Sequence, residues 1–160
     1  MYRISQSYDV FDVDLDLDGH PDKVVSSAQG MGKELIFFLR DGNGYREVLR
    51  GTNLAEDGGR VFGGVNPVVH DPGRSEVLTI TNFFPKGADV AVHYISYGKE
   101  GWVLSRTIYI VSDWRRRGSY RHHCEVVQGI PLQELALGDG GKKVQELPEE
   151  ANRDEVCEKE

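Results

Sequence analysis

The stretch Glu34–Tyr45 reads ELIFFLRDGNGY and combines a strand signal with a turn signal. Its five consecutive apolar residues, Leu35–Leu39, suit a buried strand and are too few for a membrane helix. The turn Asp41-Gly42-Asn43-Gly44 follows directly. A glycine-rich turn of this kind favours a tight hairpin, because glycine readily adopts the backbone twist that matches the flanking strands. This segment therefore predicts two antiparallel strands joined by a short turn.

The same pattern extends along the chain in both directions. Short segments rich in Val, Ile, Tyr, Phe and Thr alternate with turns that contain many of the 19 glycines. No helix is expected before Leu132, so we predict an all-β body, an antiparallel sandwich. The candidate strands are Ser7–Val13, Lys23–Ala28, Glu34–Arg40, Tyr45–Leu49, Val65–Val69, Glu76–Phe83, Asp89–Tyr97, Trp102–Val111 and His122–Gln128.

Two parts of the chain share one order of features: an apolar strand, a second apolar strand, a glycine-rich turn and an aromatic residue. These units span residues 7–55 and 65–111, and two stacked units can close a core that one cannot. We predict a single β domain over residues 1–138 made of these two units. The alternative is a chance similarity between two β meanders. Residues 139–160 are rich in Asp and Glu and predict a short helical or disordered acidic tail.

The most specific chemical signal is an acidic loop near the N-terminus. The segment Asp12–Asp22 reads DVDLDLDGHPD and contains the pattern DxDxDGxxD. Calcium takes about six to eight oxygen ligands, and a glycine at the sixth position allows the sharp bend of a loop that surrounds the ion. Val25 stands where an EF-hand carries a glutamate, so we predict a structural Ca²⁺ site on strands. Its ligands would be Asp14, Asp16, Asp18, the His20 carbonyl and Asp22; the alternative is a solvated acidic turn.

From Asp12 to Val48 the chain resembles the FG-GAP or VCBS-type calcium-loop β repeat. In that family a DxDxDGxxD loop precedes an apolar strand, and a DGxG-aromatic hairpin follows. The second unit has only Asp71 at the corresponding place, so the resemblance implies one calcium site. It also implies a C2-like sandwich or two stacked meander units.

Small exported bacterial proteins of this kind are similar to C2-like inhibitors of peptidoglycan-cleaving lysozymes. Those inhibitors act as periplasmic immunity proteins against effectors injected by secretion systems, in pairs that resemble a toxin and its antitoxin. The resemblance therefore implies a calcium-binding immunity protein or enzyme inhibitor that blocks a secreted cell-wall hydrolase or toxin.

A basic segment stands out in this acidic chain. The segment Asp113–His123 reads DWRRRGSYRHH, and Arg, Trp and Tyr dominate the energetics of protein interfaces. Its arginines suit a carboxylate-lined cleft, because guanidinium groups pair with carboxylates through two hydrogen bonds. The alternative is a hairpin tip whose arginines pair with the acidic tail. The candidate partner-binding residues are Trp114, Arg115, Arg116, Arg117, Tyr120, Arg121 and His122.

Composition narrows the choice of partners. The net charge of −7 disfavours nucleic acid and favours a protein partner or a bound cation. No apolar run is long enough for a membrane helix, and Met1–Gln6 lacks the apolar segment of a signal peptide. A periplasmic or secreted location would therefore apply to a mature form. Cys124 and Cys157 form one disulfide that pins the tail in an exported protein, or remain two separate thiols.

Catalysis is not expected from this sequence. The serines lack the G-x-S-x-G context of an activated nucleophile, and the histidines are scattered. The alternative to an inhibitor is a non-catalytic surface or carbohydrate-binding module. In that case Trp102, Trp114 and the tyrosines would form a platform on which sugar rings stack.

Overall fold

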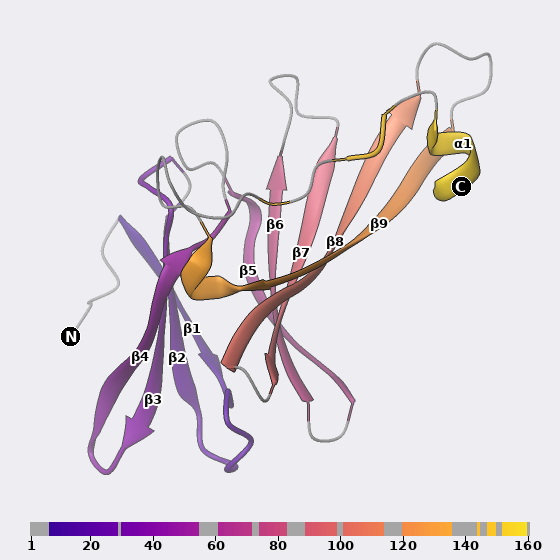
Figure 1. Ribbon diagram of the computed structural model, residues 1–160. Coiled ribbons are helices and arrows are strands. Elements are labelled where there is room, and N and C mark those ends of the chain that lie inside the picture. The colour runs from indigo at the N-terminus through magenta and orange to yellow at the C-terminus, as the bar shows by residue number, and fades with distance from the viewer. Residues whose placement is uncertain are drawn as a thin grey trace.

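A computed structural model describes residues 7–28, 30–54, 61–71, 74–82, 89–98, 101–113, 120–135, 144, 147–149 and 152–159. The fold is all-β, with two antiparallel sheets that lie against each other as a sandwich (Figure 1), as the sequence predicted. Each of the nine predicted strands corresponds to an observed strand, with ends shifted by a few residues. In the part of the chain so described, no helix is long and apolar enough to cross a membrane.

The smaller sheet contains four strands that pair in chain order. They are β1 (Tyr8–Val13), β2 (Asp22–Ser27), β3 (Glu34–Asp41) and β4 (Gly44–Thr52). The predicted tight turn joins β3 to β4, where Asp41 pairs with Gly44 and Gly42 has φ of 58°. Glycine adopts this left-handed conformation without steric cost. All strands of this sheet lie within the predicted unit 7–55.

The larger sheet has the strand order β10-β9-β8-β7-β6-β5. Strands of the predicted unit 65–111 belong to this sheet, so the two units lie in different layers of the sandwich. After β9 the chain turns through the short 3-10 helix η1 (Leu132–Glu134) toward the smaller sheet (Figure 1). The strands are β5 (Val61–Asp71), β6 (Arg74–Asn82), β7 (Val90–Gly98), β8 (Gly101–Asp113), β9 (Tyr120–Pro131) and β10 (Glu158–Lys159).

The hydrophobic core lies between the two sheets and contains residues from both. Alternation along each strand directs one set of side chains inward. Phe37 of β3 meets Trp102 of β8 edge to face across the sandwich, with ring centroids 4.7 Å apart. The buried residues of this cluster are Val13, Leu15, Val24, Leu35, Phe37, Leu49, Val77, Ile95, Trp102, Leu104, Ile130, Leu132 and Leu135.

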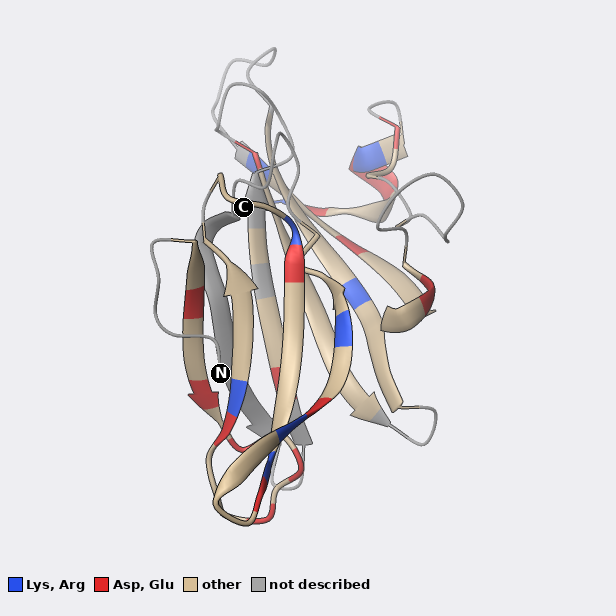
Figure 2. Ribbon diagram, turned by 90° about the vertical axis from the view of Figure 1, so that its left-hand side faces the viewer, with Lys and Arg blue, Asp and Glu red and all other residues tan. Residues whose placement is uncertain are grey.

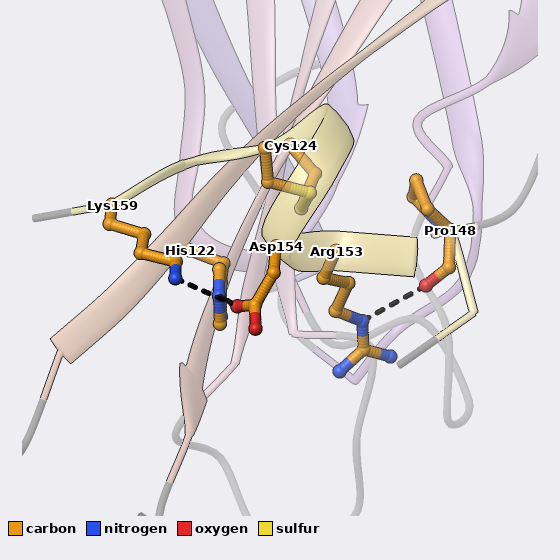
Figure 3. The surroundings of a disulfide bond; sticks show 7 residues. His122, Cys124, Pro148, Arg153, Asp154 and Lys159 are labelled. Carbon is orange, nitrogen blue, oxygen red and sulfur yellow. Dashed lines mark hydrogen bonds and ion pairs between the residues drawn. A yellow bond between two sulfur atoms is a disulfide. The ribbon is translucent and has the colours of Figure 1, made fainter. Parts of the chain in front are cut away.

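The C-terminal segment covers a part of the larger sheet that the smaller sheet does not cover. A second buried cluster, Ala91, Tyr109, Val111 and Cys124, packs against Leu147 and Cys157. Cys124 and Cys157 form a disulfide, so of the two arrangements open from the sequence the structure has the bonded one (Figure 3). The helix α1 (Arg153–Val156) and strand β10 adjoin this bond, and β10 pairs with β9.

A buried polar group separates the two apolar clusters. The ring Nδ1 of His93 lies 2.9 Å from the Thr107 hydroxyl oxygen, which accepts a hydrogen bond of 3.2 Å from the Gln128 amide. Complete burial lowers the pKa of His93 to about 3, since a charged imidazolium would lose its hydration there. His93 is therefore neutral at physiological pH and has a structural role in the core.

Candidate metal centre and partner surface

The loop between β1 and β2 brings three of the five predicted calcium ligands together. One carboxylate oxygen from each of Asp14, Asp16 and Asp18 lies within 4.8 Å of the others. Acidic residues gather in this loop at one end of the smaller sheet (Figure 2). Carboxylate oxygens at such separations suit a hard cation such as Ca²⁺.

Hydrogen bonds to the Asp14 carboxylate coil the loop around this cluster. The backbone N–H of Asp18 donates to Oδ1 at 3.1 Å, and that of Gly19 donates to Oδ2 at 2.9 Å. Leu17 and Gly19 adopt positive φ angles of 62° and 87°, which reverse the chain direction within a few residues. The alternation of acids with Leu15 and Leu17 therefore does not continue as a regular strand through this segment.

The electrostatics of Asp16 reflect this crowding. Its carboxyl pKa is raised, first by desolvation and then by the negative charges of Asp22, Asp18 and Asp14. A hydrogen bond from the Asp18 backbone acts in the opposite direction. Because like charges disfavour each other's ionised forms, a bound cation would relieve the repulsion.

Asp22 occupies a different environment from the three clustered acids. Its side chain is 1% exposed, and its oxygens accept hydrogen bonds from the backbone N–H groups of Leu15 at 2.8 Å and Arg40 at 2.7 Å. It thus ties the start of the loop to β3. The predicted ligand at His20 is its carbonyl; its exposed imidazole lies 3.3 Å from an Asp18 carboxylate oxygen.

Asp22→Ala is expected to lower the free energy of unfolding by about 2–3 kcal/mol, because it leaves two N–H groups without their charged acceptor. A loss of this size should persist in chelator, measured by urea denaturation, because the two hydrogen bonds need no ion. Asp12→Ala is the matched control, since Asp12 forms an exposed ion pair with Lys23 and such pairs contribute about 1 kcal/mol or less. A loss from Asp22→Ala confined to calcium would contradict this anchoring role.

Only some of the predicted partner-binding residues are among the residues that the structure describes. Trp114, Arg115, Arg116 and Arg117 lie outside the described residues, and Tyr120 begins β9. Arg121 is exposed, whereas His122 is 3% exposed and its Nε2 lies 3.1 Å from Asp154 Oδ1. Lys159 Nζ lies 3.0 Å from the same oxygen, so His122 belongs to the attachment of the C-terminal segment (Figure 3).

The outer face of the larger sheet carries a row of interface-type residues that sequence reasoning missed. The guanidinium of Arg106 stacks over the Tyr94 ring at 4.2 Å from its centroid, and Val127 beside it is 72% exposed. The register pairs Tyr94 with Arg106 and Arg106 with Val127. Alternation along β9 places Arg121 on this same face. Only the register reveals the row, because its members are far apart in the sequence.

Comparisons with protein-family models, with curated proteins and with solved structures find no match to this chain. We therefore describe the class of this protein by its fold and its candidate site. It is an antiparallel β-sandwich with a coiled cluster of three aspartates and a disulfide-bonded C-terminal segment.

Proposed function

We propose that this protein is a calcium-stabilised protein-binding module, and specifically an immunity protein or inhibitor that blocks a secreted cell-wall hydrolase or toxin. The cluster of Asp14, Asp16 and Asp18 carries the calcium part of this proposal. All three acids come from one contiguous loop on a β scaffold, which suits an ion that stiffens the fold. The resemblance of this loop to a calcium-loop β repeat supports the same assignment.

The disulfide supports a periplasmic or secreted location. Disulfides such as Cys124–Cys157 persist in oxidising compartments and are rare in the reducing cytosol. Calcium loops of extracellular modules bind the ion at about 10⁻⁴–10⁻³ M, a range in which cytosolic calcium leaves them empty. The disulfide and the calcium loop therefore both favour a periplasmic or secreted location.

The outer face of the larger sheet supports a protein partner. Its row of Tyr94, Arg106 and Val127 combines an aromatic ring, a guanidinium and an exposed aliphatic side chain. Tyrosine and arginine are enriched among the residues that dominate protein interfaces. Arg121 adds an exposed positive charge to this face. Arg106 already pairs with Glu125 at 3.4 Å on this face, so Arg121 is the arginine offered to a partner with a carboxylate-lined cleft, which is the chemistry of many glycoside hydrolases.

Asp16→Ala and Asp18→Ala test the calcium site. Each is expected to lower the free energy of unfolding by about 1–2 kcal/mol in millimolar calcium, because ligand binding to the folded state adds stability. In chelator the change should be close to zero, because relief of the repulsion among the acids offsets the loss of the backbone hydrogen bond that each carboxylate accepts. Thermal unfolding with and without chelator measures both quantities. An equal loss under both conditions would show that the loop does not act through a metal.

A capture experiment tests the partner. The immobilised protein is exposed to secreted bacterial proteins in calcium, and retained proteins are assayed for cell-wall lysis with and without the free protein. We expect a retained hydrolase that the protein inhibits. Arg121→Ala should weaken retention, whereas Arg40→Ala, which removes an exposed arginine from the smaller sheet, should not. If every candidate hydrolase stays fully active at saturating protein, the proposal is wrong.

A further inference from the structure

A groove of about 350 Å³ lies between the two sheets at the end that carries the acidic loop. Its walls come from the loop after β1, from β3 and β4, and from β7, β8, β9 and η1. Its volume falls in the range of about 300–1,000 Å³ that small-molecule sites occupy. The groove is distinct from the outer face proposed for the protein partner, since Trp102 and Leu15 in its wall belong to the core between the sheets.

An aromatic pair forms one wall of the groove. Tyr97 is 57% exposed, and its ring centroid lies 4.7 Å from that of Trp102, which is only 9% exposed. Trp102 also makes an edge-to-face contact with Phe37 in the core, so the ring that supports Tyr97 is itself held by the core. The sequence suggested Trp102 as part of a sugar platform; the structure buries Trp102 as the support and exposes the Tyr97 ring.

Three polar side chains from different elements line the same groove. Asp16 comes from the acidic loop and offers acceptors, Arg46 comes from β4 and offers donors, and Gln133 comes from η1 and offers both. Leu39 and Val48 complete an apolar part of the wall. The single acid and single base give the lining no excess charge, which favours an uncharged ligand rich in hydroxyl groups.

We propose that this groove binds a neutral saccharide, with the apolar face of a pyranose ring stacked on Tyr97. Sugar hydroxyls donate to Asp16, accept from Arg46, and do either with Gln133. A sugar ring matches both halves of the lining, because its C–H groups form an apolar face and its rim carries donors and acceptors. This site goes beyond the proposed protein-binding function and does not depend on it.

The saccharide site is also coupled to the acidic loop. Asp16 belongs to the cluster of three aspartates and, together with Leu15, lines the groove. A cation that holds the loop in its coiled form therefore holds one wall of the groove in place. This coupling, unlike the saccharide site itself, rests on the proposed calcium site.

Isothermal titration calorimetry of the full chain with cellotriose and with tri-N-acetylchitotriose tests the proposal. We expect saturable binding of at least one of these probes in calcium, with an affinity about tenfold lower in Tyr97→Ala, as for truncation of a central contact residue. Tyr97→Phe should retain the affinity because it keeps the ring. Tyr45→Ala is the control, since Tyr45 is another exposed tyrosine but is not among the residues that line the groove. Gln133→Ala, at an exposed position outside the core, should also weaken binding.

Two results would overturn the saccharide site: no saturable binding of either probe at millimolar concentration, or unchanged affinity in folded Tyr97→Ala and Gln133→Ala. If Tyr97→Ala instead abolishes capture of a protein while neither probe binds, the groove accepts a protein side chain and the saccharide site is wrong. Saccharide binding by a chain that inhibits no hydrolase would leave this inference standing and remove the proposed function. The two failures are therefore distinguishable.

Discussion

Phe37→Ala is expected to lower the free energy of unfolding by about 3–5 kcal/mol, the range for removal of a buried aromatic side chain. Phe37 is fully buried in the core between the sheets and contacts Trp102 on the opposite sheet. Removal of the ring loses the free energy gained by its burial and leaves a cavity. The other contacts between the two sheets keep them apart, so they cannot move together to fill it. The cost should therefore exceed that of any substitution on the outer faces.

Urea denaturation of the wild type and the variant measures this loss. Val127→Ala is the control, since Val127 is largely exposed and its truncation should change stability by about 0.5 kcal/mol or less. Phe37→Leu should fall between the two, because leucine fills part of the volume. A loss below about 1 kcal/mol in Phe37→Ala would contradict a shared core. Because Trp102 supports Tyr97, the same variant should also weaken saccharide binding.

Loss of the disulfide is expected to have the second large effect, a decrease of about 3–4 kcal/mol in the free energy of unfolding. The bond joins residues 33 positions apart, and a cross-link over that distance removes conformational entropy from the unfolded chain. In the folded state it holds the C-terminal segment over Tyr109 and Val111. Without the bond, this segment is held by the pairing of β10 with His122 and His123 and by the contacts of Asp154 with His122 and Lys159.

The double variant Cys124→Ser/Cys157→Ser and the reduced wild type should lose the same amount of stability in urea denaturation. Reductant should not affect the double variant, which controls for other effects of the reagent. Hydrogen exchange should report faster exchange of the amides of β10 and of the adjoining part of β9. If reduction leaves both the unfolding free energy and this exchange unchanged, the bond does not contribute to stability.

Local sequence signals were sufficient for the strands and hairpins. The segment Leu35–Leu39 and the turn Asp41-Gly42-Asn43-Gly44 predicted β3 and β4, and each sheet pairs its hairpin-connected strands in chain order. The coil around Asp14 was also accessible from the sequence, because its hydrogen bonds join residues at most five positions apart. Short-range chemistry of this kind does not depend on how the sheets pack.

Other features required the tertiary structure. Asp22 matches the ligand spacing of a calcium loop, and its contact with the Arg40 backbone, 18 positions away, adds an anchoring role that the spacing does not show. Strand β10 has only two residues and was missed because the disulfide and β9 position it.

The amino-acid sequence by itself therefore determined the all-β class, the hairpins and the acidic loop, since each depends on neighbours along the chain. Tertiary packing alone decided which aromatic ring is exposed, as Trp102 is buried against Phe37 while Tyr97 faces the groove. It also decided that Arg106 stacks on Tyr94. The physical reason is that burial and cross-strand contact are set by the register and approach of the sheets, which no local pattern specifies.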